Sequence, residues 1–254
     1  DVCYSDLRNA GTYVAPHAVN LIVHRNNQRL DEDLATVVDH RVPLVITSVG
    51  KPGDIADAVH GYGGTLFHDV TNVRHAQKAL ESHADGLILV CAGAGGHAGT
   101  TNPFALVPEV RSFFDGPVIL SGCISDGRSI RAAQTLGADL AYLGTRFIAT
   151  EEANAPPLYK ETILDSGAAD ITYTPEFSGI PGSYLTKSIV NAGLDPADLL
   201  LPGQSANREY RSGQDKPKAW STIWGAGQGV GTISEVLPAV ELAQRLKAEY
   251  EAAA

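Results

Sequence analysis

Two glycine turns, each at the end of an apolar run, most constrain what this chain can fold into. Residues 117–146 read PVILSGCISDGRSIRAAQTLGADLAYLGTR, where one apolar run ends at Gly122 and a second ends at Gly144 and Thr145. Apolar residues recur at helical spacing between the runs and stop at Gly137, which predicts a strand, a helix and a strand. This succession implies parallel pairing, so both turns lie at one edge of a sheet.

The paired turns predict a phosphate-binding site. Glycine removes the Cβ that would keep an anion away from backbone N–H groups, and each turn leads towards a helix N-terminus, whose partial positive charge favours phosphate. A single turn of this kind is more simply explained by the geometry of a tight strand-to-helix connection. In a (β/α)₈ barrel, however, the loops after the last two strands commonly bind a phosphate, so the pair predicts strands seven and eight of such a barrel.

Four further apolar runs precede this unit and alternate with helix-like segments. The expected strands are 18–23, 43–49, 65–70 and 86–92, and the expected helices are 30–40, 52–61, 71–83 and 102–114. Unbroken apolar strands are typical of a parallel sheet covered on both faces. We therefore expect an α/β fold, a TIM (β/α)₈ barrel that shows strands three to eight over residues 14–150 and has its first two βα units upstream of Asp1. A doubly wound open sheet of six strands is the competing fold.

Beyond these strands the pattern loosens. Residues 151–234 are expected to hold a helix at 151–166 and then a stretch, 172–234, that is rich in glycine and proline. This stretch is either a surface excursion or a lid over the barrel mouth, because long loops in compact domains are often functional. Residues 235–251 predict an amphipathic helix that packs on the barrel exterior, and residues 1–13 predict a loop or the remnant of a preceding helix. No linker interrupts the chain, so a single domain is expected.

Composition excludes several classes of partner. The 254 residues carry a formal charge of −10 and a pI near 5.2, whereas nucleic acids and anionic membranes attract basic surfaces, so neither is an expected partner. No apolar run approaches the roughly 20 residues of a membrane-spanning helix. The three cysteines, Cys3, Cys91 and Cys123, lack metal-ligand spacing, so we expect reduced thiols, a cytoplasmic location and no metal site.

The loop after the expected strand 86–92 reads CAGAGGHAGT and surrounds His97 with four glycines. Such a backbone can lie flat against a planar ligand, and a histidine with an ordinary pKa of about 6.5 suits proton transfer near neutrality. A lone histidine is more often structural than catalytic, but this setting favours a catalytic His97. His68, one strand earlier, is expected to be a hydrogen-bonded structural residue. Cys91 and Cys123 are expected to be buried small residues and not nucleophiles.

Three motifs, AGAGGHAG, SGCISDGR and GADLAYLGTRF, resemble in their order and spacing the flavin-dependent nitronate monooxygenase family, over most of residues 14–190. The resemblance implies a barrel that binds FMN non-covalently, and it implies that His97 takes the α-proton of a nitroalkane. The cofactor-binding residues that it implies are Asn20, Gly95, Gly96, Ser121, Gly122, Cys123, Gly144 and Thr145, with the phosphate on backbone groups around the last four.

The chain departs from this family pattern at three positions. Gly93 stands where many members have a glutamate, Cys123 stands where they have a second glycine, and Asp69 stands where some have a lysine. Charge near a flavin ring is a principal lever that a protein has over the cofactor, so these departures bear on nitronate specificity. Phosphate binding is expected to survive them.

The activity implied by the resemblance is oxidation of alkyl nitronates or nitroalkanes by dioxygen, which yields a carbonyl compound and nitrite; a homodimer is left open. Two other classes of function remain. The related flavin-dependent enoyl-acyl-carrier reductases share the glycine and histidine loop, which allows an NAD(P)H-linked reductase of enoyl thioesters, although no G-x-G-x-x-G unit follows a strand. The other alternative is a non-catalytic barrel that binds a flavin or another phosphate ligand.

Overall fold

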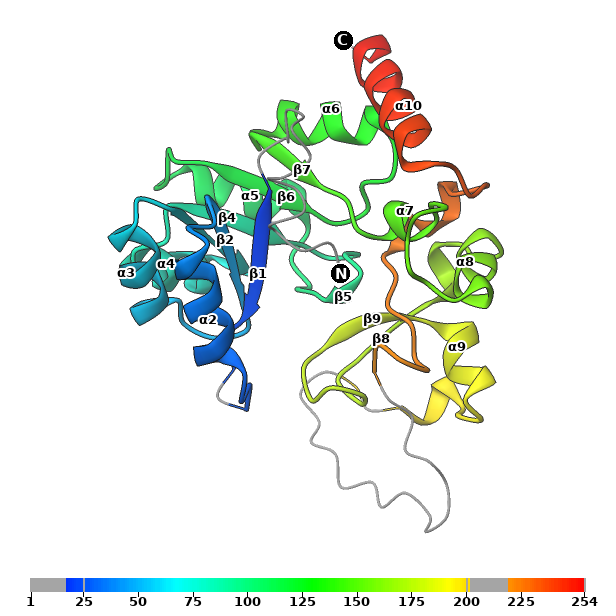
Figure 1. Cartoon of the computed structure of the whole chain (residues 1–254). Helices are drawn as coiled ribbons and strands as arrows, with labels where there is room; N and C mark the ends of the chain where they lie inside the picture. Colours follow the sequence, from blue (N-terminus) through cyan, green and yellow to red (C-terminus); the bar gives the residue numbers. More distant parts are fainter. Residues whose placement is uncertain (1–16, 25, 200, 202–218, 254) are drawn as a thin grey trace. The chain divides into compact units, whose positions relative to one another are not determined.

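The structure is a computed structural model that describes residues 17–24, 26–199, 201 and 219–253 (Figure 1). The loop or helix remnant expected at residues 1–13, with Cys3, lies outside the described residues, as does the part of the glycine-rich stretch at 202–218. The chain divides into two compact units. The first runs to Leu89 and takes in Phe113–Val118, and the second consists of Val90–Ser112 and the chain from Ile119 onward.

The parallel strands follow the chain in the order β1-β2-β3-β4-β6-β7. Their bounds are β1 Ala18–Ile22, β2 Leu44–Ser48, β3 Thr65–Val70, β4 Gly86–Val90, β6 Val118–Ser121 and β7 Leu140–Tyr142. A doubly wound sheet reverses its strand order at a switch point, whereas consecutive strands joined by helices are the connectivity of a (β/α)₈ barrel. The fold is therefore the predicted α/β barrel class, and all six strands lie where the sequence places them.

Three helices pack along the strands of the first unit, as Figure 1 shows: α2 (Leu30–Asp39), α3 (Gly53–Gly61) and α4 (Val73–Glu81). Strands β2 and β3 are buried along most of their length, with Val45, Leu66 and Val70 fully buried, whereas β1 is mostly exposed. In the parallel register Val45 lies opposite Leu66, which places buried side chains of β2 and β3 side by side.

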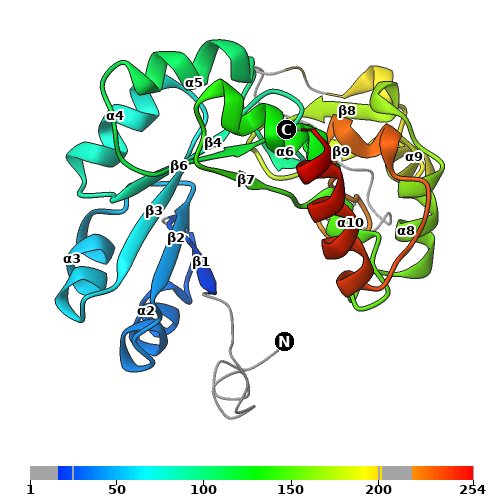
Figure 2. The same cartoon turned by 90° about the horizontal axis from the view of Figure 1, so that it is seen from above.

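The helices of the second unit are α5 (Pro103–Arg111), α6 (Gly127–Leu136), α7 (Thr145–Ile148), α8 (Pro157–Leu164), α9 (Thr186–Asn191) and α10 (Ala239–Ala252). Asn102 caps α5 by accepting a hydrogen bond from the Phe104 N–H, and a proline follows at the first helical position, as predicted. Gly137 ends α6 in the left-handed conformation at φ +118. The closing helix α10 packs against α6, which Figure 2 shows from above.

The stretch at 172–234 contains more regular structure than its composition suggests. Strands β8 (Ile171–Thr174) and β9 (Gly182–Leu185) form an antiparallel pair, and β9 also pairs with the short strand β5 (Gly96–His97). Strand β9 is buried along its whole length, so this part of the stretch is core and the expectation of a surface excursion is wrong for it. Very short strands separated by glycine and proline give little periodic signal, which is why the sequence did not show them. That other parts of residues 172–234 form a lid over the barrel mouth stays a prediction.

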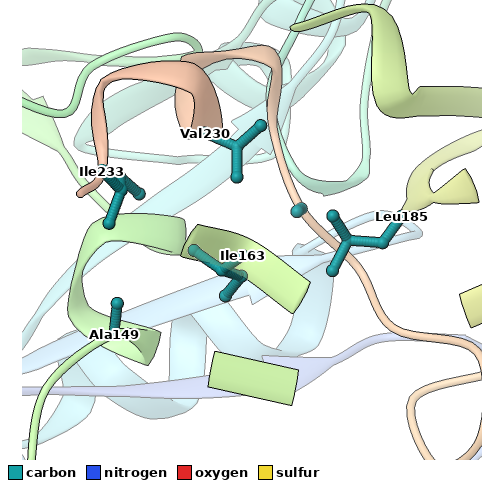
Figure 3. Packing of buried hydrophobic residues seen from close by; sticks show 6 residues of the cluster. Ala149, Ile163, Leu185, Val230 and Ile233 are labelled. Carbon is teal, nitrogen blue, oxygen red and sulfur yellow. The ribbon is translucent and has the colours of Figure 1, made fainter. Parts of the chain in front are cut away.

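The core of the second unit is built from segments that are far apart in sequence. Ala149, Ile163, Leu185, Val230 and Ile233 pack together, and none of them is more than 3% exposed (Figure 3). They come from the ends of α7 and α8, from β9 and from the 3₁₀ turn η3 (Gln228–Thr232). Each fully buried aliphatic side chain of the larger kind contributes about 1.5–3 kcal/mol, so this cluster holds η3 against the helices.

Two features are absent from the described residues. No helix among them is both long enough and apolar enough to cross a bilayer. Within the same ranges, histidine, cysteine, aspartate and glutamate side chains form no group of three or more that could hold a metal ion.

Candidate functional site

The backbone at the ends of β6 and β7 presents unpaired donors. Within the described part of the chain, the N–H groups of Gly122, Cys123, Gly144 and Thr145 donate no hydrogen bond to the protein. Strands β6 and β7 pair directly with each other, so the two turns are neighbours. Several backbone N–H groups that converge without a protein acceptor form an anion-binding site.

Gly144 leaves space that the described protein does not fill. A Cβ built on Gly144 would meet no atom within 4 Å, and its φ of −109° is open to any residue. Gly122 differs, because its φ is +134° and a Cβ would lie 3.2 Å from the Ala92 carbonyl oxygen. The protein's own backbone therefore explains a glycine at 122, whereas the free space at Gly144 suits a bound anion.

The first turn of α6 is already occupied by the chain's own carboxylates. The Gly127 N–H donates to Glu249 Oε2 at 2.8 Å, and the Ser129 N–H donates to Asp126 Oδ1 at 2.7 Å. A Cβ on Gly127 would lie 2.3 Å from the Leu246 carbonyl oxygen, so α10 approaches this turn at backbone distance. Both glycine turns lead towards a helix N-terminus, as predicted, but in α6 two N–H groups of the first turn already donate to carboxylates of the chain. Its free donors lie earlier, in the turn itself.

Strand pairing holds His97 in place. The register sets His97 opposite Gly182, and the imidazole Nε2 lies 2.9 Å from Ser178 Oγ. The Ser178 hydroxyl donates to the Ile180 carbonyl oxygen at 3.0 Å. Because a hydroxyl has only one proton, Ser178 then accepts from His97, which assigns the imidazole proton to Nε2 and leaves the lone pair on Nδ1.

The protonation state of His97 follows from its burial. Burial lowers the pKa of His97 below its ordinary value, because the charged form loses water. Trp220 meets the imidazole edge to face, with 5.2 Å between the ring centroids. The side chain is therefore neutral at neutral pH, with one nitrogen fixed and the other free to take a proton.

Packing within the second unit explains two glycines of the His97 loop. A Cβ on Gly95 would lie 2.8 Å from the Gly227 nitrogen, and a Cβ on Gly93 would lie 2.2 Å from Cys123 Sγ. Close backbone approach is thus a sufficient reason for a glycine at 95. Cofactor binding by Gly95 and Gly96 stays a prediction.

Residues 225–231 form a part of the site that was not predicted from the sequence. The Gly227 N–H donates to Thr145 Oγ1 at 3.0 Å, and the Ser125 hydroxyl donates to the Gly229 carbonyl oxygen at 2.9 Å. This segment therefore ties the turn after β6 to the turn after β7. Glycine at every second position of WGAGQGVG was the available signal, because residues without a Cβ allow close approach to neighbouring backbone.

Cys123 has an unusual backbone. Its φ of +56° lies in the left-handed region, which costs a residue other than glycine about 1–3 kcal/mol. The residue is exposed, so the prediction that it is buried is wrong. Its sulfur is still partly desolvated, and this raises the pKa of the thiol. Cys91 is buried as predicted, and burial raises its pKa to about 12, so neither cysteine is a thiolate at neutral pH.

In the first unit a polar chain links three neighbouring strands. Ser48 Oγ lies 3.2 Å from Asn20 Oδ1 and 2.7 Å from Asp69 Oδ2. Burial raises the pKa of Asp69 to about 6, and its Oδ1 has no partner among the described residues. The Ser48 hydroxyl donates to the Asp69 carboxylate, and this hydrogen bond offsets part of the rise in pKa that burial causes.

His68 is 5% exposed, and its Nδ1 lies 2.7 Å from Thr47 Oγ1. Burial lowers the pKa of His68 to about 4, so the ring is neutral. This agrees with the prediction of a hydrogen-bonded structural histidine.

The predicted site residues fall into two sets. The second unit brings together the strand-end residues and the glycine loop: Gly95, Gly96, His97, Ser121, Gly122, Cys123, Gly144 and Thr145. Asn20 belongs to the first unit, where the Ser48 hydroxyl holds it.

A protein family matches this chain over most of its length. Residues 8–249 match the nitronate monooxygenase family. The chain belongs to this family. A probable nitronate monooxygenase of Staphylococcus haemolyticus is 35% identical to it over 166 residues, which are 60% of this chain and 46% of that protein. The chain thus spans about half the length of this curated relative.

Two solved structures share the fold. FabK from Thermotoga maritima is 25% identical with a TM-score of 0.77, over 98% of this chain and 79% of that chain. A nitroalkane oxidase from Streptomyces ansochromogenes is 26% identical with a TM-score of 0.69, over 88% of this chain and 68% of that chain.

Proposed function

We propose that the chain belongs to an FMN-dependent oxidoreductase that oxidises alkyl nitronates or nitroalkanes with dioxygen to a carbonyl compound and nitrite. Membership of the nitronate monooxygenase family supports the reaction. The observation that carries the cofactor assignment is the group of unpaired N–H donors beside the free space at Gly144, which suits the FMN phosphate. When bound, the flavin supplies the two-electron oxidation and the transfer of electrons to dioxygen.

His97 is the proposed base. A neutral nitroalkane must lose its α-proton, and the lone pair on Nδ1 is available to take it because Nε2 is bound to Ser178. The imidazolium that forms keeps its Nε2 hydrogen bond to Ser178, whose hydroxyl donates to the Ile180 carbonyl. A nitronate is already ionised and does not need this step.

Substitution of Gly144 tests the cofactor site. The wild-type protein is expected to be yellow and to release FMN on denaturation. Gly144→Leu places a side chain in the free space, and an overpacking cost of about 1–3 kcal/mol weakens FMN binding by about 5-fold to 150-fold. Gly61→Leu is the matched control, because a Cβ there also meets no atom within 4 Å but lies at the end of α3. Equal FMN content in both variants would remove the phosphate site from the proposal.

Substitution of His97 tests the base. His97→Asn is expected to keep FMN and to lose turnover of a neutral nitroalkane by about 10²-fold to 10⁴-fold, while oxidation of the corresponding nitronate falls much less. His83→Asn, at an exposed histidine in the first unit, is the control. Wild-type turnover of the neutral nitroalkane by His97→Asn would exclude His97 as the base.

A second candidate is NAD(P)H-linked reduction of an enoyl thioester. It is favoured by the structural match to FabK, which has a higher TM-score than the nitroalkane oxidase and covers more of the chain. Anaerobic mixing separates the candidates, because reduction bleaches the flavin colour. Rapid bleaching by NADPH supports the reductase, and rapid bleaching by a nitronate supports the nitronate oxidation.

A further inference from the structure

An apolar pocket lies in the second unit, next to the indole ring that contacts His97. Its walls include Ile148, Pro156, Tyr159, Trp220 and Trp224, and its volume is about 520 Å³. Small-molecule sites are typically clefts of about 300–1,000 Å³ lined mainly by apolar and aromatic side chains. The pocket therefore has the size and the lining of a site for a small organic group.

Trp220 joins this pocket to the proposed base. Its indole lines the pocket and also meets the His97 imidazole edge to face, with 5.2 Å between centroids. Two other aromatic residues of the lining pack on each other, because Trp224 stacks on Tyr159 with 5.0 Å between centroids and 12° between planes. A group held against Trp220 in the pocket therefore lies one ring away from His97.

The lining of the pocket disfavours a charged ligand group. None of the described residues that line the pocket is charged, and the Tyr159 hydroxyl donates to the Gly225 carbonyl oxygen. Apart from the indole N–H groups, the other polar side chains among the described lining residues are those of Asn154 and Ser221. A carboxylate or phosphate would lose water here without an ionic partner, whereas a planar apolar group gains contact with the aromatic walls.

We propose that this pocket binds an uncharged aromatic substituent of the substrate while the reacting carbon lies at His97. The preferred substrates are then nitro compounds with an aromatic tail, and short nitroalkanes are poor ones. The reaction at the carbon rests on the proposed function, but binding of the aromatic group does not.

Kinetics with two substrates test the proposal. Burial of a phenyl ring is expected to raise kcat/KM for 1-nitro-2-phenylethane about 10-fold to 100-fold above that for nitroethane. Ala155→Phe fills the pocket and should abolish this preference while leaving nitroethane turnover intact, which also shows that the variant folds. Asn154→Leu makes the lining more apolar and should increase the preference. Ala197→Phe, at an exposed alanine in the 3₁₀ turn η2 (Pro196–Asp198), is the control and should leave it unchanged.

Binding of an unreactive compound separates the pocket from the reaction. Calorimetry of the flavin-loaded protein should show binding of 2-phenylethanol in the wild type and its loss in Ala155→Phe, with no binding of ethanol or phenylacetate. The sequence contains two tryptophans, Trp220 and Trp224, and both line the pocket. A change in tryptophan fluorescence on binding therefore reports on this pocket.

Failure of the proposed reaction and failure of the pocket proposal give different results. If 2-phenylethanol binds as expected but neither nitro compound is oxidised, the pocket stands and the proposed reaction is wrong. If both nitro compounds are oxidised with equal kcat/KM and 2-phenylethanol does not bind, the reaction stands and the pocket proposal is wrong. An unchanged substrate preference in Ala155→Phe would also overturn the pocket proposal.

Discussion

Gly93 and Cys123 share one space, so a substitution at one position changes what the other tolerates. A Cβ on Gly93 would lie 2.2 Å from Cys123 Sγ and 2.9 Å from Gln228 Oε1. Gly93→Ala in the native chain must therefore displace the thiol. In a Cys123→Gly background the sulfur is absent, and the new methyl group has only the flexible end of Gln228 to move.

The expected cost has two parts. Gly93 has φ +82°, and an alanine in the left-handed region costs about 1–2 kcal/mol whatever stands at position 123. Overlap with Sγ adds about 1–3 kcal/mol, and only this part disappears with Cys123→Gly. Cys123→Gly alone is nearly neutral, because relief of its φ of +56° is offset by the greater freedom of glycine in the unfolded chain.

Denaturant unfolding of the wild type, both single variants and the double variant measures the coupling. Gly93→Ala should lower the free energy of unfolding by about 2–5 kcal/mol, and the coupling should be about 1–3 kcal/mol, or about 2–12 °C in Tm for a chain of this size. Gly179→Ala is the matched control, because Gly179 has φ +76° but open space for a Cβ, so it reports the backbone cost alone. Additive effects within about 0.5 kcal/mol would refute the shared space.

Three further predictions follow from burial and close contacts. Because burial lowers the pKa of His97, kcat/KM for a neutral nitroalkane should fall on the acid side with an apparent pKa below the ordinary value of histidine; an apparent pKa of 7 or more in the pH profile would contradict this. The folded-state pKa of Asp69, about 6, lies above the ordinary 3.8, so its ionisation lowers stability as pH rises through this window. The change that Asp69→Asn makes to the free energy of unfolding should therefore be more favourable at pH 8 than at pH 4, by up to about 3 kcal/mol. Equal changes at both pH values in denaturant unfolding would disprove the raised pKa of Asp69. Gly127→Ala should destabilise by about 3 kcal/mol, because its Cβ would lie 2.3 Å from both the Leu246 oxygen and the Tyr250 nitrogen; a loss below about 0.5 kcal/mol in the same assay would show that α10 can move away.

The sequence alone determined the features that depend on local pattern. The apolar runs predicted all six parallel strands. Asn102 and Pro103 predicted the start of α5, and Gly137 predicted the end of α6. Glycine at 122 and 144 marked the two turns whose N–H groups are unpaired in the described chain. These features were predictable because a strand period, a helix cap or a left-handed φ is set by a few adjacent residues.

Only the tertiary structure decided which distant segments meet. Ser178 lies 81 residues from His97 in the chain, and Gly227 lies 82 residues from Thr145, yet each pair is joined by a hydrogen bond. The same holds for Glu249, which occupies the first turn of α6 from 122 residues away. A hydroxyl, a glycine N–H or a carboxylate carries no local mark of its partner. The partner is chosen when the whole chain packs and each buried donor must find an acceptor, so the surroundings of the candidate base and of the helix terminus could not be read from the sequence.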